Sequence, residues 1–218
     1  MHFQPGDSSL GWEKEGLLNT MIQTILALDR KLFLLINTGM ANPVLDFAFP
    51  HMTQLKFWLL PLAVILALYY RREGKKGLLV LLLGMILIGI TDPLCVRVLK
   101  PLFGRHRPCD PDFLVEGGRF LMGNLKSLSF PSAHAVNLFG LSAFFSLLYG
   151  RYWLIFFCSA GIISFTRVYV GVHYPLDVFT GAGTGLTLGY LYGKAALWLL
   201  SRLKIPAYED TQGNRPSQ

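Results

Sequence analysis

The sequence predicts an all-α protein, a polytopic membrane helix bundle of five spans with one further helix near the N-terminus. Apolar side chains make up 52% of the 218 residues and charged ones only 15%, whereas soluble domains carry roughly 25% charged residues. Long apolar runs recur along the chain, each close to the ~20 residues that a spanning helix needs. This composition excludes a disordered chain, a nucleic-acid-binding domain and an ordinary cytosolic enzyme.

Five apolar runs are expected to cross the membrane. They are residues 57–70 (with a start near 54), 78–99, 135–149, 153–165 and 178–200. The third and fourth runs are short, so polar residues at their ends are expected to lie inside the bundle with partners or water. Residues 54–205 are therefore predicted to form one transmembrane domain.

The N-terminal segment, residues 1–53, differs from the rest. Residues 17–36 are apolar enough to span, but Asp29, Arg30 and Lys31 stand in the middle of the run. This pattern favours an amphipathic helix in the membrane interface, with a sixth span as the alternative. The polar residues 206–218, which include Pro and Gly, are predicted to be a disordered tail.

The loop charges predict the orientation of the bundle. If the five runs span alternately, most basic loop residues fall on one side, which the positive-inside rule makes cytoplasmic. These are Arg71, Arg72, Lys75, Lys76, Arg151, Lys194, Arg202 and Lys204. The segments 101–133 and 166–177 then face the exterior.

Three clusters of reactive side chains fall in or next to these exterior segments. They are Lys100-Pro-Leu-Phe-Gly-Arg105-His106-Arg107-Pro108, Pro131-Ser132-Ala133-His134, and Thr166-Arg167 followed by His173 and Asp177. Cations on this side run against the positive-inside bias, and a bound polyanion such as phosphate explains them, because Arg forks and Lys bind phosphate oxygens.

The local sequence pattern favours an anion-binding site next to two catalytic histidines. Ser132 suits a helix N-cap, so the free amides of Ala133 and His134 would attract phosphate. Pro175 suits the first turn of the last helix, and Asp177 can reach His173, four residues earlier. A neutral, oriented histidine is a competent nucleophile toward phosphorus, and a second histidine can protonate the leaving oxygen.

The three clusters, in this order and spacing, resemble the type-2 phosphatidic acid phosphatase superfamily of integral membrane lipid phosphatases. The matching residues are Lys100 with Arg107-Pro108, then Pro131-Ser132-Ala133-His134, then Thr166-Arg167, His173 and Asp177. The resemblance covers about residues 55–200. It implies a helical bundle, no metal and a phosphohistidine intermediate.

The resemblance also implies residue roles. His173 would be the nucleophile, Asp177 its orienting partner, and His134 the general acid and later the base. Lys100, Arg107 and Arg167 would bind phosphate, with Ser132 and the Ala133 amide completing the pocket. Two residues depart from the family pattern: Ala133 replaces Gly and Thr166 replaces Ser. Ala133 would be strained only if this position requires a positive φ.

Other features have simpler interpretations. Arg105 is interpreted as a snorkelling side chain at a helix end, and His106 as an exposed loop residue. Asp92 and Arg97 are interpreted as a buried ion pair or a brace for Lys100. No cofactor is predicted, and a metal is rejected because cations rather than carboxylates surround the histidines.

Two further patterns are a repeat of glycines in the last apolar run and a long loop between the second and third runs. Gly181, Gly185, Gly189 and Gly193 recur every fourth residue, which predicts close helix packing inside the bundle, with dimerisation as the alternative; the oligomeric state is not predicted. The loop 109–130 is long and apolar for a bundle connection, and we expect it to lie at the membrane surface and help select the lipid headgroup.

The sequence therefore predicts a bacterial inner-membrane hydrolase that acts on a lipid phosphate or diphosphate at the exterior face. The short build resembles undecaprenyl-diphosphate phosphatases, which makes undecaprenyl diphosphate the favoured substrate. The alternatives are phosphatidylglycerophosphate or phosphatidate, and the 1-phosphate of lipid A. A non-catalytic lipid binder or transporter is disfavoured because His134, His173 and Asp177 are all present.

Overall fold

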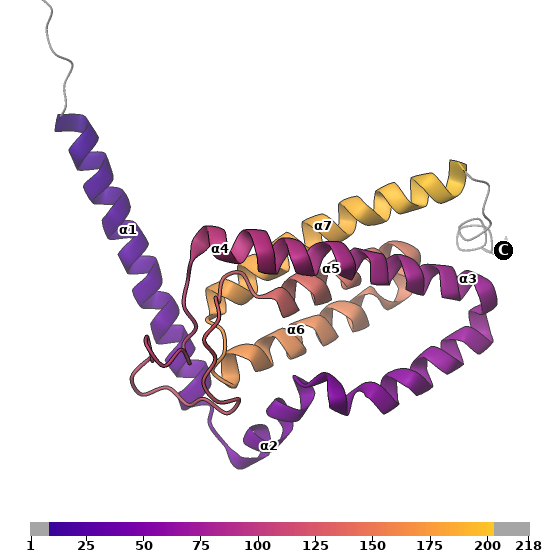
Figure 1. Cartoon of the computed structure of the whole chain (residues 1–218), viewed down its shortest axis with the longest axis horizontal. Coiled ribbons are helices and arrows are strands. Elements are labelled where there is room, and N and C mark those ends of the chain that lie inside the picture. The colour runs from indigo at the N-terminus through magenta and orange to yellow at the C-terminus, as the bar shows by residue number, and fades with distance from the viewer. Residues whose placement is uncertain (1–8, 203–218) are drawn as a thin grey trace, which may run out of the picture.

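The fold is built from helices, and no strand occurs among residues 9–202, the part of the chain that the computed structural model describes (Figure 1). The α-helices are α1 (Ser9–Leu34), α2 (Pro43–Met52), α3 (Leu59–Pro93), α4 (Lys100–Phe103), α5 (Ala133–Leu148), α6 (Trp153–Tyr169) and α7 (Pro175–Arg202). Two short segments are π-helical, Leu35–Gly39 and Leu94–Leu99. Two others are 3-10 turns, Leu55–Phe57 and Gly150–Tyr152. The predicted all-α class is confirmed, and the predicted tail, residues 206–218, lies outside the described residues.

Helix α3 consists of two limbs that join at a sharp bend. Gly74 has φ 60° and ψ −139°, which breaks the helical path, and glycine tolerates such a positive φ because it lacks a Cβ. Figure 1 shows the second limb turning back from this bend toward α4. The bend falls in the polar stretch 71–76, where the sequence separates the first two apolar runs.

The number of membrane spans is only partly established. By length and composition, Leu59–Phe103 and Gly150–Tyr169 could each cross a membrane. The segment Gly16–Gly39 with Pro43–Met52, bent by 113°, would make a third candidate. The five-span count stays a prediction, and so does the choice between an interfacial helix and a further span for residues 17–36.

Helices α5 and α7 pack at unusually close range along a row of glycines. Gly181, Gly185, Gly189 and Gly193 are all buried and all face α5 or the residue before it. A Cβ on Gly185 would lie 2.2 Å from the Val136 carbonyl oxygen, and one on Gly189 2.1 Å from that of Gly140. The glycine row therefore serves packing within this chain, as the sequence predicted.

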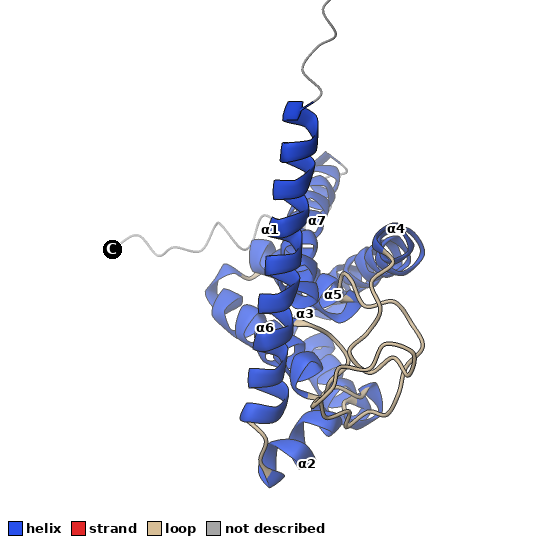
Figure 2. Cartoon of the chain, turned by 90° about the vertical axis from the view of Figure 1, so that its left-hand side faces the viewer, coloured by secondary structure: helices blue, strands red, loops and turns tan. Residues whose placement is uncertain are grey.

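The C-terminal part of α1 attaches to the end of the bundle where α6 stops and α7 starts. Phe33 is fully buried and packs against Tyr174, with ring centroids 5.5 Å apart. In the following turn, the Asn37 side-chain amide donates to the Tyr169 and Arg119 carbonyl oxygens, both at 2.7 Å. The rest of α1 extends past the bundle (Figure 2), so only its last turns are fixed by packing.

The glycine row predicts opposite outcomes for two neighbouring substitutions in α7. Gly185→Ala should lower the free energy of unfolding by about 1–3 kcal/mol, because the new methyl group collides with the α5 backbone. Gly183→Ala is the matched control, since a Cβ there meets nothing within 4 Å. Thermal unfolding in detergent should show a lower midpoint for Gly185→Ala alone; equal midpoints for both variants would contradict this packing.

Candidate active site

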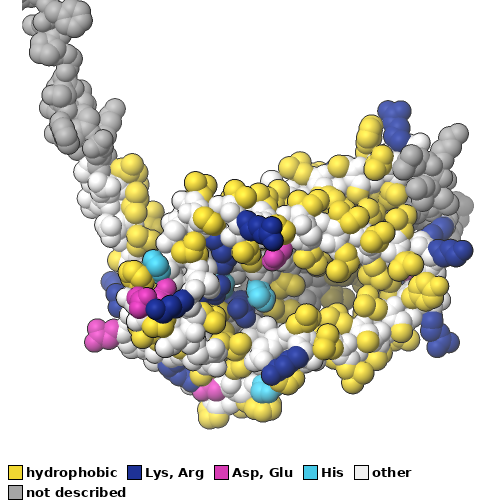
Figure 3. All heavy atoms as spheres, viewed as in Figure 1, with side chains coloured by type: hydrophobic (Ala, Val, Ile, Leu, Met, Phe, Trp, Pro, Cys, Tyr) yellow, Lys and Arg dark blue, Asp and Glu magenta, His cyan; other side chains and the backbone are white. Residues whose placement is uncertain are grey.

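The three sequence clusters meet at one end of the bundle. Helix α4 ends there, α5 and α7 begin there, and the α6–α7 connection carries His173. In Figure 3 the histidines visible on this face lie in the same half of the molecule, while hydrophobic side chains cover much of the remaining helical surface. All the predicted site residues therefore belong to elements that reach one end of the bundle.

His173 and Asp177 form the buried centre of this cluster. His173 is 1% exposed and Asp177 0%. The imidazole Nδ1 lies 3.2 Å from Asp177 Oδ2, which is the contact that the four-residue spacing predicted. The Tyr174 backbone amide donates to the same carboxylate oxygen at 2.8 Å, and the Ser129 hydroxyl also donates to it.

The partners of His173 determine its tautomer. Nδ1 faces the acceptor Asp177, so it carries the proton, and Nε2 is left with its lone pair. Nε2 lies 3.2 Å from Arg107 Nη1, which also donates to the Val172 carbonyl oxygen at 2.9 Å. The basic nitrogen of His173 therefore points at a guanidinium group that can bind an anion.

The surroundings of His173 keep it neutral. Burial and the charge of Arg107 lower the pKa of the imidazole, the hydrogen bond to Asp177 opposes them, and the net pKa is about 3. At neutral pH the ring is therefore uncharged, which is the state that a nucleophile requires.

Three cations with mostly buried side chains surround this centre. Lys100, Arg107 and Arg167 are 6%, 9% and 8% exposed. Lys100 donates to the Leu128 carbonyl oxygen at 2.7 Å, Arg107 to Ser127 Oγ at 2.7 Å, and Arg167 to Thr53 Oγ1. Among the described residues, no carboxylate forms an ion pair with any of the three.

Two polar atoms of this cluster lack hydrogen-bond partners. Ser132 Oγ and Arg167 Nε are buried and unpaired in the described part of the chain. Such groups are costly in a protein interior unless something binds them. Both belong to residues that the sequence predicts to contact phosphate.

The start of α5 differs in detail from the expectation. Ser132 occupies the N-cap position but makes no side-chain capping bond; its backbone amide instead donates to the Asp177 carbonyl oxygen at 3.0 Å. Ala133 is the first residue of α5 and has a right-handed helical conformation. The condition for strain at this position is therefore not met.

His134 lies in the first turn of α5 and, unlike His173, is exposed. Arg107 and Lys100 act electrostatically on both rings, so the two histidines share one cationic environment. One imidazole is thus enclosed beside the cations, and the other is open to an approaching molecule.

Several residues of the site carry no motif in the sequence. Ser127 and Ser129 come from the long loop 109–130, which also supplies the Leu128 carbonyl oxygen to Lys100. Thr53, the partner of Arg167, follows α2. The loop is anchored by buried Cys109 and Val115 and by the Leu121 amide, which donates to the Val170 carbonyl oxygen at 3.1 Å.

Two of the simpler interpretations were wrong, those of Arg105 and of an Asp92–Arg97 ion pair. Arg105 does not snorkel, because it forms ion pairs with Asp29 and Asp177. The interpretation of His106 as an exposed loop residue is confirmed; its Nδ1 also lies 2.9 Å from Asp110 Oδ2, and its ring stacks on Phe113.

Asp92 is not paired with Arg97 in the described part of the chain. Asp92 accepts a hydrogen bond from Asn137 of α5 at 2.9 Å, and Arg97 is exposed.

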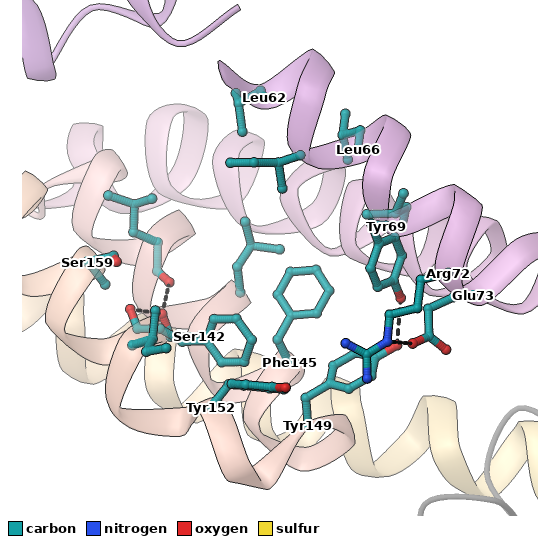
Figure 4. Close-up of a pocket in the computed structure, with 17 residues that line it drawn as sticks. Leu62, Leu66, Tyr69, Arg72, Glu73, Ser142, Phe145, Tyr149, Tyr152 and Ser159 are labelled. Carbon is teal, nitrogen blue, oxygen red and sulfur yellow. Dashed lines mark hydrogen bonds and ion pairs between the residues drawn. The ribbon is translucent and has the colours of Figure 1, made fainter. Parts of the chain in front are cut away.

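A large apolar cavity lies along α5, beyond His134 (Figure 4). Its volume is about 550 Å³, and its walls come from both limbs of α3, from α5, from α6 and from Tyr152 in the turn between α5 and α6. Leu138, one turn after His134, lines it near the site. Tyr69 and Tyr149, whose hydroxyls lie 2.6 Å apart, stand with Arg72 and Glu73 at its polar end (Figure 4).

The chain is also similar in sequence to known proteins. A family model described as the PAP2 superfamily matches residues 77–200. A lipid A 4'-phosphatase of Bacteroides thetaiotaomicron is 32% identical over 189 residues, which cover 84% of each chain.

Two crystal structures also resemble the fold. A phosphatidylglycerolphosphate phosphatase of the transmembrane PAP2 type from Bacillus subtilis has a TM-score of 0.58 and 27% identity, covering 81% of this chain and 88% of its own. Aquifex aeolicus LpxE has a TM-score of 0.51 and 29% identity, covering 75% of this chain and 93% of its own.

The environment of His173 predicts an unusual titration. Its pKa of about 3 lies well below the ~6.5 of an unperturbed histidine, so the ring should stay neutral as the pH falls from 8 to 5. The NMR signal of His173 Cε1, assigned by its loss in His173→Gln, measures this directly. A constant chemical shift over that range is expected, and a midpoint near 6.5 would contradict the buried geometry.

Proposed function

The chain belongs to the PAP2 superfamily, and we propose that it removes a phosphate from the sugar headgroup of a lipid A-type glycolipid. It is a membrane lipid phosphatase of that family. The sugar phosphate is favoured because the similarity to the lipid A 4'-phosphatase extends over 84% of both chains.

The charge balance of the site is the observation that carries this proposal. Four cations and two carboxylates meet there: Lys100, Arg105, Arg107 and Arg167 against Asp29 and Asp177. Two positive charges remain uncompensated. A phosphate monoester carries about −1.5 to −2 charges at pH 7, which matches this excess. Buried charges are stable only when paired, so a phosphate dianion is the ligand that suits the site.

In the proposed first step, His173 Nε2 attacks phosphorus in line with the sugar oxygen. A nitrogen–phosphorus bond forms as the phosphorus–oxygen bond breaks. His134, whose protonated form is favoured by the charge of the bound phosphate dianion, gives its proton to the departing sugar oxygen, which leaves as a hydroxyl. Lys100, Arg107 and Arg167 stabilise the charge on the phosphoryl oxygens. The Ser132 hydroxyl and the amides of Ala133 and His134 complete the set of donors.

In the second step, water attacks the phosphohistidine. His134, now neutral, accepts a proton from the water as its oxygen bonds to phosphorus, and the bond to His173 breaks. Asp177 keeps the proton of His173 on Nδ1 throughout. Inorganic phosphate leaves, and both histidines return to their starting states.

The cavity along α5 suits the acyl chains of the substrate. It begins one turn from His134 and is lined mostly by apolar side chains. A lipid whose phosphate lies beside His173 could place a chain in it. The positive-inside rule puts the site at the exterior face of a bacterial inner membrane, which we include in the proposal.

Undecaprenyl diphosphate, which the short build of the sequence predicts, stays the second candidate, followed by phosphatidylglycerophosphate and phosphatidate. Phosphate release from the purified protein in detergent, measured on these three lipids and on lipid A, tests the proposal. We expect the highest kcat/KM on a lipid A phosphate, unchanged activity in EDTA, and at least ~10³-fold lower kcat in His173→Gln.

Arg151→Gln, on the opposite end of the bundle, is the matched control and should retain activity. A markedly higher kcat/KM on undecaprenyl diphosphate than on lipid A would contradict the proposed substrate and identify undecaprenyl diphosphate as the substrate instead. Full activity in His173→Gln would refute the nucleophile, and loss of activity in EDTA would refute the metal-free mechanism.

A further inference from the structure

Arg105 connects the N-terminal helix to the carboxylate that orients the nucleophile. One guanidinium nitrogen lies 2.7 Å from Asp177 Oδ1 and the other 2.5 Å from Asp29 Oδ2 of α1. The Arg105 side chain is 18% exposed, and the two carboxylates only 0% and 4%. These contacts join residues 148 positions apart in sequence, from Asp29 to Asp177, through a single planar group.

The guanidinium of Arg105 has little freedom to move. It stacks on the Tyr174 ring at 3.9 Å, and Phe33 of α1 packs against the same ring. An arginine held at both ends of its fork and over one face fixes the carboxylates that it binds. Asp177 Oδ1 is thereby held by Arg105, while Oδ2 remains turned toward His173.

Asp29 has a second contact that reinforces this arrangement. Its Oδ1 accepts the backbone amide of Leu176 at 2.8 Å, in the first turn of α7. The first amides of a helix have no partner within the helix, and a carboxylate there is favourable. Asp29 therefore fixes the start of α7, the same turn that carries Asp177, as well as Arg105.

We propose that Arg105 and Asp29 are positioning residues for catalysis: α1 orients the Asp177 carboxylate, and through it the His173 imidazole, from outside the family's motifs. This rests on the proposed function of His173. Asp29 also holds Arg105 away from the phosphate. The phosphate oxygens therefore bind Lys100, Arg107 and Arg167, and Arg105 does not become a fourth phosphate ligand. The attacking Nε2 then keeps its direction toward phosphorus during each turnover.

The test compares phosphate release by Arg105→Gln, Arg105→Lys and Asp29→Asn with that of the unmodified protein. Misplacing a reacting group slightly can cost about 10²-fold in rate, so Arg105→Gln should lower kcat by about that factor with KM nearly unchanged. Arg105→Lys should lose less, because an ammonium can hold one carboxylate. Arg97→Gln is the control, since Arg97 is exposed, lies eight residues earlier in the chain and should retain full activity.

Two further readouts separate positioning from general damage. The double variant Asp29→Asn/Arg105→Gln should be no slower than Arg105→Gln alone, since residues of one network are not additive. The pKa of His173, measured by NMR, should also rise in Arg105→Gln. Without the Arg105 charge, the Asp177 carboxylate stabilises the protonated imidazole more strongly, while Arg107, Lys100 and Ser129 are unchanged. If Arg105→Gln does not fold, Arg105→Lys and Asp29→Asn give the same comparison.

A raised KM with unchanged kcat in Arg105→Gln would overturn the proposal, because it would make Arg105 a phosphate ligand. Unchanged kcat together with an unmoved His173 titration would overturn it as well. In both cases an inactive His173→Gln variant, assayed in parallel, would show that the proposed function still holds while the role of α1 does not.

Discussion

The burial of the Asp177 carboxylate is the constraint on which the rest of the site depends. An unpaired carboxylate inside a protein costs several kcal/mol, so this one has to be satisfied from every side. It receives the His173 ring, the Ser129 hydroxyl, the Tyr174 amide and the Arg105 guanidinium. These groups come from the long loop, the α6–α7 connection and the end of α4, so compensating one charge brings together segments that are distant in sequence.

The glycine row of α7 gives this network a rigid support. Because α5 and α7 approach closely, the Ser132 amide reaches the Asp177 carbonyl oxygen, and the start of α5 is aligned with the start of α7. The enclosed nucleophile and the exposed His134 are therefore carried by two helices that cannot easily slide past each other. Precision in the site follows from the absence of side chains at these four positions.

The sequence predicted those parts of the site that depend on local spacing. The contact between His173 and Asp177, the packing role of the glycines and the meeting of Lys100, Arg107 and Arg167 follow from short motifs and from alternating apolar runs. Asp29, Thr53 and Ser129 were not predicted, since their partners are chosen by tertiary packing and no spacing marks them. Arg105 was misinterpreted for the same reason, because its two carboxylates lie on α1 and α7. The number of spans stays open because composition alone does not separate an interfacial helix from a crossing one.

The central claim, attack by His173 Nε2, is tested most directly by trapping the covalent intermediate. The His134→Gln variant lacks the base for the second step and also the acid for the first. A ³²P-labelled aryl phosphate, whose leaving group departs without a proton, should therefore leave label on this variant after rapid quenching. Peptide mapping should find it on His173, bonded to Nε2, because Nδ1 faces Asp177. Label on another residue or on Nδ1, or no label in a variant that still releases phosphate, would contradict the account.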